Sequence, residues 1–391
     1  MDIVITSAAR TPVGSFQGAL SSFSATKLGS IVIKEVVKRS GIRVEDVDQV
    51  IMGNVLSAGL GQAPARQACV YAGLPTSTRC MTVNKVCGSG LKSVMLAANE
   101  IKLGESKIII AGGQESMTNA PYILPKARSG YRMGDGKIID SMIYDGLWDV
   151  YNNFHMGHVG DFTSKKYNFS RERLDEYASE SYRRAQKAQE EGKFKEEMIS
   201  IAIPRKKKEP VIVDEDEEPK KVRFEKIPNL KPVFGKEGVT TAANASTIND
   251  GAAAVVVMSE ETANKNNCKI LAKIVAYDEV SQDPLEFTTA PVEAIKNVLD
   301  KTNLIIEEID LFEINEAFSC VPLYAIDQLG LDHAKVNVNG GAVALGHPIG
   351  ATGTKILVTL IHALRDRGAK RGLTTLCIGG GEAVAMIVET I

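Results

Sequence analysis

The sequence predicts an α/β protein made of two related halves, with a large segment inserted into the first half. Three observations support this prediction: a repeat between the two ends of the chain, an alternation of short apolar runs with helical patterns in each copy, and a long intervening segment of different composition. The chain has 391 residues, of which 44% are hydrophobic and 24% are charged. This composition is typical of a globular protein with two or three domains, and it excludes a disordered or disulfide-stapled chain.

The repeat begins near the N-terminus. Residues 34–48 (KEVVKRSGIRVEDVD) align without gaps with residues 296–310 (KNVLDKTNLIIEEID). Further along, CGSG at 87–90, a helical pattern and an apolar run ending in glycines parallel IGATG at 349–353, a helical pattern from Lys355 and the run LCIGG. The match indicates an internal duplication. We place the boundary between the halves at 268, so the first spans residues 1–268 and the second 269–391.

Each half alternates strand-like and helical patterns. Apolar runs of about five residues, such as 108–111, alternate with helical patterns of about ten to fifteen residues. Helical spacing is clear for the apolar residues Leu91, Val94, Met95, Ala98 and Ile101. These patterns predict βα units and a largely parallel sheet in each half, with the halves stacked as a pseudo-dimer. Ligands of such folds bind beyond the carboxyl ends of strands, where the loops are rich in glycine here.

An inserted segment separates the last strand of the first copy from its neighbour. In the second copy the run GGG at 379–381 passes directly into a strand-like run at 383–388, whereas the equivalent run at 252–258 follows only after residues 114–250. This insert contains Tyr, Asn and Met clusters, a charged helical pattern and a basic-then-acidic stretch. We interpret residues 114–250 as a loop domain grafted onto the first half.

Composition also excludes several classes of partner. The net charge of −2 gives no overall basic field for nucleic acid or anionic lipid. The longest apolar runs are far shorter than the roughly 20 residues that a membrane span requires. The first residues resemble neither a secretory nor a mitochondrial targeting segment. We expect a cytoplasmic protein, or one of the mitochondrial matrix if a presequence was removed before the numbering.

The six cysteines include no CxxC pair, which disfavours both a zinc ribbon and a disulfide framework. Four of them have the setting of ordinary packing residues, at 69, 80, 268 and 320. Cys87 differs, because it lies on a glycine-rich turn between a strand-like run and a helix. A helix N-terminus favours the thiolate and lowers a thiol pKa. We therefore expect Cys87 to be a nucleophile; the alternative is a packed cysteine.

Three more loops carry reactive residue types. His347 lies among glycines at 339–350, and an imidazole that titrates near neutrality can accept a thiol proton and later return it. Cys377 precedes three glycines, a setting that suits either an oxyanion hole or a simple tight turn. Asn315, in the segment EINEAF, can donate to a carbonyl oxygen or hold a water, although a helix cap is the ordinary explanation.

Taken in order, the motifs VCGSG, NEAF, GGAVALGHPIG and CIGGG resemble the thiolase family, and within it the acetyl-CoA acetyltransferases. The similarity covers residues 3–391, and the stretches 214–218, 241–247 and 290–292 look closest to the mitochondrial-type acetoacetyl-CoA thiolases. The resemblance implies the thiolase fold, in which two βαβαβαββ halves stack in αβαβα layers with an inserted loop domain. It also implies a reversible Claisen condensation of two acetyl-CoA to acetoacetyl-CoA and CoA.

The resemblance also assigns roles to the reactive loops. Cys87 would be the nucleophile that becomes acetylated in a ping-pong mechanism, and Cys377 the base that takes a proton from the incoming acetyl-CoA. His347 would activate Cys87 and bind the thioester oxygen, while Asn315 holds a water in the same oxyanion hole. The backbone N–H groups of Cys87 and Gly379 would form a second hole.

The resemblance implies CoA as a substrate and no tightly bound cofactor. The matching contact positions lie mostly in the loop domain: Leu147, His155, Met156, Phe234, Ala242, Ser246, Ala317 and Phe318. Where many relatives hold the nucleotide with an Arg and a Ser, this chain has Pro219 and Lys226. Lys220, Lys221 and Arg223 are candidates to replace those contacts, although a charge run is usually a solvated face.

Mitochondrial-type relatives further imply a potassium ion, a substrate preference and an assembly. The positions matching the potassium site are Tyr182, Ala242, Ala243, Ala245 and Val343. These relatives accept 2-methyl-branched substrates beside a Phe-Pro pair, whereas this chain has Phe287 and Thr288, so acceptance of branched substrates stays open. The family usually forms homotetramers through the loop domain, and residues 121–132 are the matching segment.

Three alternatives stay open on the sequence. A broader 3-ketoacyl-CoA thiolase of β-oxidation would differ in the chain length that it cleaves. A decarboxylating ketoacyl synthase would use one cysteine with two histidines, or with histidine and asparagine, and Cys377 argues against it. A non-catalytic acyl-CoA-binding protein would have no reason to keep all four reactive positions. Condensation and thiolysis both stay open as the physiological direction, because the same residues serve both directions.

Overall fold

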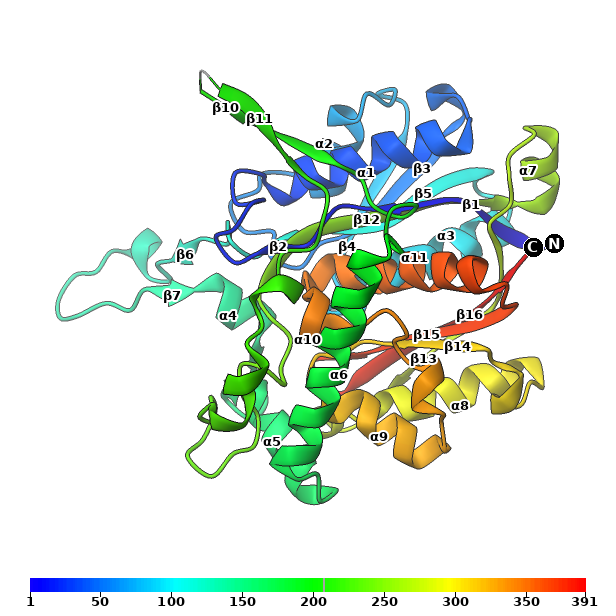
Figure 1. The fold of residues 1–391 in the computed structure, drawn as a ribbon. Helices are drawn as coiled ribbons and strands as arrows, with labels where there is room; N and C mark the ends of the chain where they lie inside the picture. Colours follow the sequence, from blue (N-terminus) through cyan, green and yellow to red (C-terminus); the bar gives the residue numbers. More distant parts are fainter. Residues whose placement is uncertain (207) are drawn as a thin grey trace.

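The computed structural model describes residues 1–206 and 208–391, and its helices and strands alternate in αβαβα layers (Figure 1). The predicted arrangement is confirmed. The outer helices are α1 (Ala25–Ser40) and α2 (Pro64–Tyr71) on one side and α8 (Ala290–Thr302) and α9 (Cys320–Leu329) on the other, and the middle layer holds α3 (Ser89–Lys102) and α11 (Ile349–Arg367). Helix α11 begins at Ile349, earlier than the predicted start at Lys355.

The strands of both halves belong to one 10-stranded sheet. The first half contributes, in spatial order, β1 (Ile3–Arg10), β12 (Asn249–Ser259), β5 (Ile108–Ser116), β3 (Gln49–Gly53) and β4 (Arg79–Val83), with β2 (Gly14–Ser15) beside β12. The second half contributes β13 (Ala272–Ser281), β16 (Glu382–Thr390), β15 (Arg371–Ile378) and β14 (Leu311–Ile314). Because β1 pairs with β13, hydrogen bonds run without a break from one half to the other.

The prediction of a largely parallel sheet was wrong. Parallel pairing joins β3 to β4 and β5, and β14 to β15, whereas β1, β12, β13 and β16 pair antiparallel. The reason is the last strand of each repeat: β16 follows β15 through a tight turn, which suffices for an antiparallel pair, and β12 pairs with β5 in the same antiparallel way after the inserted loop domain. The two copies also differ in one strand, since the counterpart of β4 in the second half is a single bridge between Phe312 and Val336.

The loop domain lies along one side of the layers (Figure 1). Its elements are β6 (Tyr122–Ile123), β7 (Ile139–Asp140), α4 (Ser141–Gly146), β8 (Trp148–Asp149), β9 (Phe154–His155), α5 (Gly157–Lys166), α6 (Arg171–Glu190), β10 (Ile201–Arg205) and β11 (Lys208–Val213). The two remaining helices are α7 (Glu260–Lys265) and α10 (Ala342–Leu345). Ser170 caps α6 by accepting from the N–H of Arg173, which explains where the predicted charged helix begins.

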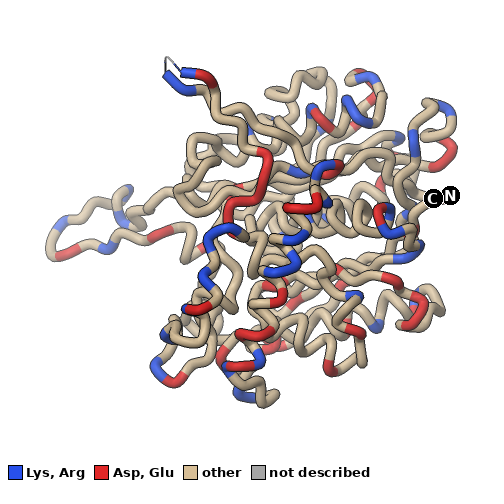
Figure 2. The backbone as a smooth tube through the Cα atoms, in the orientation of Figure 1, with Lys and Arg blue, Asp and Glu red and all other residues tan. Residues whose placement is uncertain are grey.

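Acidic and basic residues are interspersed over the chain (Figure 2), in keeping with the net charge of −2. Among the described residues, none of the helices has the length and apolar character needed to span a bilayer. The apolar residues gather instead in clusters on both faces of the sheet, and the largest cluster surrounds α3 and α11.

The middle helices approach closely because small residues meet where they cross. A Cβ atom added to Gly90 of α3 would lie 2.8 Å from the backbone nitrogen of Thr354, and one added to Gly353 of α11 would lie 2.4 Å from that of Leu91. Both contacts involve backbone atoms, so neither can be relieved by rotating a side chain. Glycine at these equivalent positions of the two repeats therefore sets the distance between the halves.

We expect Gly353→Ala to lower the free energy of unfolding by about 2 kcal/mol. Alanine gains about 1 kcal/mol over glycine in a helix interior, but the methyl group would press on the Leu91 backbone, and such overpacking costs more than that gain. Urea unfolding followed by circular dichroism measures the change. Gly235→Ala is the matched control, because no atom lies within 4 Å of its added Cβ; equal effects of both substitutions would contradict the close-approach argument.

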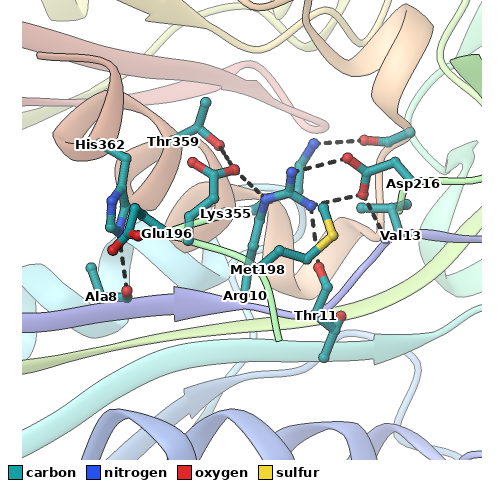
Figure 3. A network of polar contacts seen from close by, with 12 residues as sticks. Ala8, Arg10, Thr11, Val13, Glu196, Met198, Asp216, Lys355, Thr359 and His362 are labelled. Carbon is teal, nitrogen blue, oxygen red and sulfur yellow. Dashed lines mark hydrogen bonds and ion pairs between the residues drawn. The ribbon is translucent and has the colours of Figure 1, made fainter. Parts of the chain in front are cut away.

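A buried network of charges ties the loop domain to both halves (Figure 3). Arg10 of β1 donates to Glu197 at 2.5 Å and to both carboxylate oxygens of Asp216 at 2.7 and 2.9 Å. From α11, Thr359 donates to Glu197 at 3.0 Å, and Lys355 lies beside this group. Isolated buried charges are very costly, so the network must be paired throughout.

Candidate active site

Cys87 lies on a strained turn between β4 and α3. Val86, the residue before it, has a φ of +44°, a left-handed conformation that β-branched residues rarely adopt. The turn is closed by hydrogen bonds: the N–H of Lys85 donates to Ser89 Oγ at 2.8 Å, and this hydroxyl donates to the carbonyl of Val86 at 2.6 Å. The strain holds the Cys87 side chain at the N-terminus of α3.

The loop of Cys377 meets the loop of Cys87. Cys377 is near the end of β15, and Gly380 and Gly381 turn the chain with φ values of +98° and +95°. A Cβ atom added to Gly88 would lie 2.4 Å from Ile378 Cδ1, so glycine lets the two loops touch. An ion pair of 2.7 Å between Lys85 Nζ and Glu382 joins the loops at their outer ends.

The thiol of Cys87 is surrounded by the groups that the sequence singled out. The backbone N–H groups of Gly379 and of Cys87 itself, the pair that we expect in the second oxyanion hole, lie close enough to the thiol to oppose the rise of its pKa. Cys377 lies close enough for an ionised Cys87 to raise the Cys377 pKa. Both halves therefore contribute to one site: Cys87 and His347 come from the equivalent loops before α3 and α11, and Cys377 comes from the end of β15.

His347 is held by two hydrogen bonds at the start of α11. Its N–H donates to Asn249 Oδ1 at 2.8 Å, and its Nδ1 lies 2.6 Å from Thr352 Oγ1. Thr352 donates its one hydroxyl hydrogen to the carbonyl of Pro348 at 2.9 Å, so Nδ1 must be the donor to Thr352. Nε2 of His347 is then left with its lone pair, which is the form that can accept a proton.

Three polar atoms in the site are buried without a hydrogen-bond partner among residues 1–206 and 208–391. They are Nε2 of His347 and both side-chain amide atoms of Asn315. The backbone of Asn315 is fixed by its N–H, which donates to the carbonyl of Thr375 at 3.0 Å. Buried polar groups rarely stay unpaired, so these atoms point to a ligand oxygen or a water between them.

Burial reverses two of the predicted pKa shifts. We predicted a lowered thiol pKa for Cys87, but burial raises it to about 11, against the opposing effect of the N–H groups. We predicted an imidazole titrating near neutrality, but burial and then the positive charge of Lys355 lower the pKa of His347 to about 3. Burial also raises the pKa of Cys377 well above its ordinary value. All three groups are therefore neutral near pH 7.

A cavity of about 250 Å³ opens in front of Cys87 and His347. Every predicted CoA position except Ala242 lines it, namely Leu147, His155, Met156, Phe234, Ser246, Ala317 and Phe318. Phe234 stacks on His155 with ring centroids 4.7 Å apart. The other lining residues are Met117, Gly146, Val233, Ala245, Thr247, Ile248, Phe287 and Ile349. Such an apolar wall with a few polar groups is typical of a small-molecule binding site.

A second hollow of about 270 Å³ is adjacent to the first, since Thr247 lines both. Lys221, Arg223 and Lys226 line it together with Glu218, which pairs with Lys221 at 3.7 Å. Lys220 is paired with Glu215, and Pro219 is buried. Of the positions predicted for potassium, Tyr182, Ala242 and Ala243 line this hollow. Ala245 lines the main cavity, and Val343 is buried in the same cluster as Tyr182.

Within residues 1–206 and 208–391, no three His, Cys, Asp or Glu side chains are grouped so that they could hold a metal ion. A potassium site at the predicted positions would therefore depend on backbone carbonyl groups and on the hydroxyl of Tyr182. Oxygen ligands of this neutral kind suit a large monovalent cation, so the residues are compatible with one.

Several supporting residues were not predicted. Glu115 at the end of β5 accepts from Asn54 Nδ2 at 2.7 Å, from the N–H of Val55 at 3.0 Å and from the N–H of Gly350 at 2.9 Å, and burial raises its pKa to about 7. It fixes the first turn of α11. Asn249 lies far from His347 in the chain, and no pattern around it could have revealed the contact. The sequence contains one weak indication of Thr352: a hydroxyl in the first turns of the helix after His347 can reach back to the imidazole ring.

Two family descriptions match the chain. The thiolase N-terminal domain matches residues 3–261, and the thiolase C-terminal domain matches residues 268–390. Together they cover both halves and the loop domain.

Individual relatives match over nearly the whole length. The acetyl-CoA acetyltransferase of Cupriavidus necator is 51% identical over 389 residues, covering 99% of each chain. Acetyl-CoA acetyltransferase B, mitochondrial, of Xenopus laevis is 51% identical over 391 residues, covering 100% of this chain and 92% of that one. The expected special closeness to mitochondrial enzymes is therefore not found, because the bacterial relative is equally similar.

A solved structure adds the same likeness in three dimensions. The crystal structure of the Acat5 thiolase from Ascaris suum in complex with coenzyme A has a TM-score of 0.95 to this chain, at 45% sequence identity and with 100% of both chains covered.

Proposed function

The chain belongs to the thiolase family and is an acetyl-CoA acetyltransferase, and from this premise we propose how its residues divide the reaction. One observation carries the assignment. Cys87, at the turn before α3 of the first half, and Cys377, at the end of β15 of the second half, lie on loops that touch, beside a histidine whose Nε2 is free to accept a proton. A reaction that needs a nucleophile and a carbon-acid base can use one thiol for each role.

In the first half-reaction, Cys87 Sγ attacks the thioester carbonyl of acetyl-CoA while its proton passes to His347 Nε2. The thiol pKa of about 11 means that the proton moves during the attack rather than before it. The N–H groups of Cys87 and Gly379 stabilise the negative oxygen of the tetrahedral intermediate. The C–S bond to CoA then breaks, and Cys377 gives its proton to the leaving thiolate. The products are acetyl-Cys87 and CoA, with Cys377 as thiolate and His347 as imidazolium.

In the second half-reaction, the Cys377 thiolate takes a proton from the methyl group of a second acetyl-CoA. The enolate oxygen binds to protonated His347 and to a water held by Asn315, the groups whose polar atoms lack protein partners. The enolate carbon attacks the acetyl carbonyl, and the bond to Cys87 breaks. Cys87 recovers its proton from His347, so the enzyme returns to its starting state with acetoacetyl-CoA formed. Thiolysis is the same sequence in reverse.

CoA is proposed to follow the two adjacent hollows. The Ascaris suum relative was crystallised in complex with coenzyme A. In this chain the apolar cavity suits the pantetheine arm, and the hollow beyond Thr247 suits the nucleotide, because Lys221, Arg223 and Lys226 line it. Phosphate groups need only such a local basic surface, which explains why the net charge carried no signal.

We also propose an activating potassium ion and a homotetramer. Tyr182, Ala242 and Ala243 line the nucleotide hollow, where an ion would order the backbone beside CoA. The tetramer is supported by the arm between β6 and β7, which extends away from the body (Figure 1) and exposes large apolar side chains at Tyr122, Leu124, Tyr131, Met133 and Ile138. The domain limits 1–268 and 269–391 and a cytoplasmic or matrix location complete the proposal.

The test is a set of initial rates of thiolysis with acetoacetyl-CoA, 2-methylacetoacetyl-CoA and a medium-chain 3-ketoacyl-CoA, each in potassium and in sodium buffer. We expect acetoacetyl-CoA to be the best substrate and potassium to raise its rate. A higher rate with the medium-chain substrate would favour the broader thiolase, and equal rates in both buffers would contradict the ion. Light scattering tests the assembly, and a monomer would contradict the tetramer.

A further inference from the structure

We propose that Lys355 is a positioning residue for His347: it holds the peptide group that leads into the catalytic histidine and keeps a positive charge beside the imidazole. This inference rests on the proposed role of His347 as proton acceptor. Lys355 belongs to none of the four reactive loops, it lies within α11, and it touches no part of the cavity.

The contact between Lys355 and the loop is direct. Lys355 is buried, and its Nζ donates to the carbonyl of Gly346 at 3.1 Å. Gly346 has a φ of +91°, and a Cβ atom there would lie 2.5 Å from the side chain of Asn249. The N–H of His347, on the other side of the same peptide bond, donates to Asn249 at 2.8 Å. The peptide is therefore held at both its oxygen and its nitrogen.

Lys355 lies on the same helix as Thr352, the hydrogen-bond partner of the His347 ring. Thr352, which accepts from His347 Nδ1, lies three residues before Lys355 on α11, so both side chains project from one face of the helix. One rigid helix thus fixes the imidazole ring through Thr352 and the backbone through Lys355. Displacing a catalytic group by about 1 Å can cost about 10²-fold in rate, so this second support has a measurable consequence.

The charged groups that act on Lys355 come from several elements. Arg10 of β1 and Asp216 of the loop domain are drawn beside it in Figure 3. Glu197 of the loop domain and Glu313 of β14 are the other two. Burial raises the pKa of Glu313 well above its ordinary value, which favours its protonated form. Two cations, Arg10 and Lys355, then balance two carboxylates, Glu197 and Asp216. Removing the Lys355 charge would leave this buried group with an excess of negative charge.

The Lys355 charge also acts on the titration of His347. It is, after burial, the second cause of the low pKa of His347, so it keeps the imidazole neutral before the reaction begins. Burial and then the charge of Arg10 lower the pKa of Lys355 itself to about 8, while Asp216, Glu313 and Glu197 oppose the shift. Lysine should therefore lose its charge in mildly alkaline solution, and the hydrogen bond to Gly346 should weaken there. Arginine at this position would not lose its charge.

The experiment compares Lys355→Met, Lys355→Arg and the exposed control Lys296→Met in the full-length enzyme. We measure kcat and KM for thiolysis of acetoacetyl-CoA between pH 6 and pH 10, with thermal unfolding as the check on folding. Lys355→Met should lower kcat about 10²-fold with little change in KM, because the substrate-binding walls are untouched. Lys355→Arg should restore most of kcat, and its kcat should not fall above about pH 8 as that of the wild type does.

A second readout does not depend on turnover. Alkylation of Cys87 by iodoacetamide, followed by mass spectrometry, reports how readily the Cys87 proton is removed. Lys355→Met should slow it and Lys355→Arg should not. If the wild type alkylates at Cys87 but does not cleave acetoacetyl-CoA, the proposed function fails while the role of Lys355 is still measured.

The proposal is overturned if folded Lys355→Met keeps kcat and the alkylation rate within about twofold of wild type. It is also overturned if Lys355→Met and Lys355→Arg lose the same activity with the wild-type pH profile, because volume rather than charge would then matter. Should Lys355→Met fail to fold, the dependence of kcat on pH above about pH 8 in Lys355→Arg tests the proposal by itself. If kcat of Lys355→Arg falls there as it does in the wild type, the proposal is rejected.

Discussion

Replacing Cys87 with alanine is expected to reduce thiolysis of acetoacetyl-CoA by at least about 10⁴-fold. The Cys87 thiol forms the acetyl thioester that links the two half-reactions. Neither His347 nor Cys377 can replace it, because the acetyl oxygen must lie against the N–H groups of Cys87 and Gly379. The rate is measured by the loss of acetoacetyl-CoA enolate absorbance. Mass spectrometry after mixing with acetyl-CoA should show an acetyl group on wild type and none on the variant.

Cys268→Ala is the matched control, because this thiol is buried, free and far from the cavity. It should keep its activity and still acquire the acetyl group. Full thiolysis by Cys87→Ala would remove the catalytic assignment altogether, whereas loss of activity in both variants would indicate a general effect of altering buried cysteines.

Replacing Cys377 with alanine should separate the two half-reactions. Turnover is expected to fall by about 10³-fold, because no other group is placed to take the proton from the acetyl methyl group. Acetylation of Cys87 should persist, although more slowly, because the attack, the proton acceptor and the oxyanion donors are all unchanged. Rapid mixing with acetyl-CoA and mass spectrometry of the quenched protein measure the acetylated fraction.

The control for this variant is Cys320→Ala, a second buried free thiol in the same apolar cluster as Cys377. It should turn over substrate normally. If Cys377→Ala neither becomes acetylated nor turns over, the two cysteines do not have separate roles, and the division of the reaction proposed above would have to be abandoned.

The sequence revealed the duplicated plan and the four reactive loops because both are local signals. Cys87 on its glycine turn and His347 among glycines can each be recognised within about ten residues. The pKa directions of these two groups could not be predicted in the same way, because burial depends on which distant segments cover them. The thiol at a helix N-terminus has the electrostatic setting that we expected, but desolvation outweighs it.

The strand directions and the supporting residues were missed for a related reason. Alternating strand and helix patterns do not show where the last strand of each repeat will insert, and β12 and β16 insert antiparallel. Asn249 and Glu115 reach His347 and Gly350 across large sequence separations. Such contacts follow from the stacking of the two halves, which no single segment encodes.

The pairing of β1 with β13 and the crossing of α3 with α11 at Gly90 and Gly353 also bear on how the protein unfolds. Each middle helix buries residues against both halves, so neither half has a complete core without the other. Unfolding should therefore be cooperative across the boundary near 268. Since the reactive loops come from both halves, a chain with one half unfolded would have neither a working site nor a stable remaining half. Activity and global stability should be lost together.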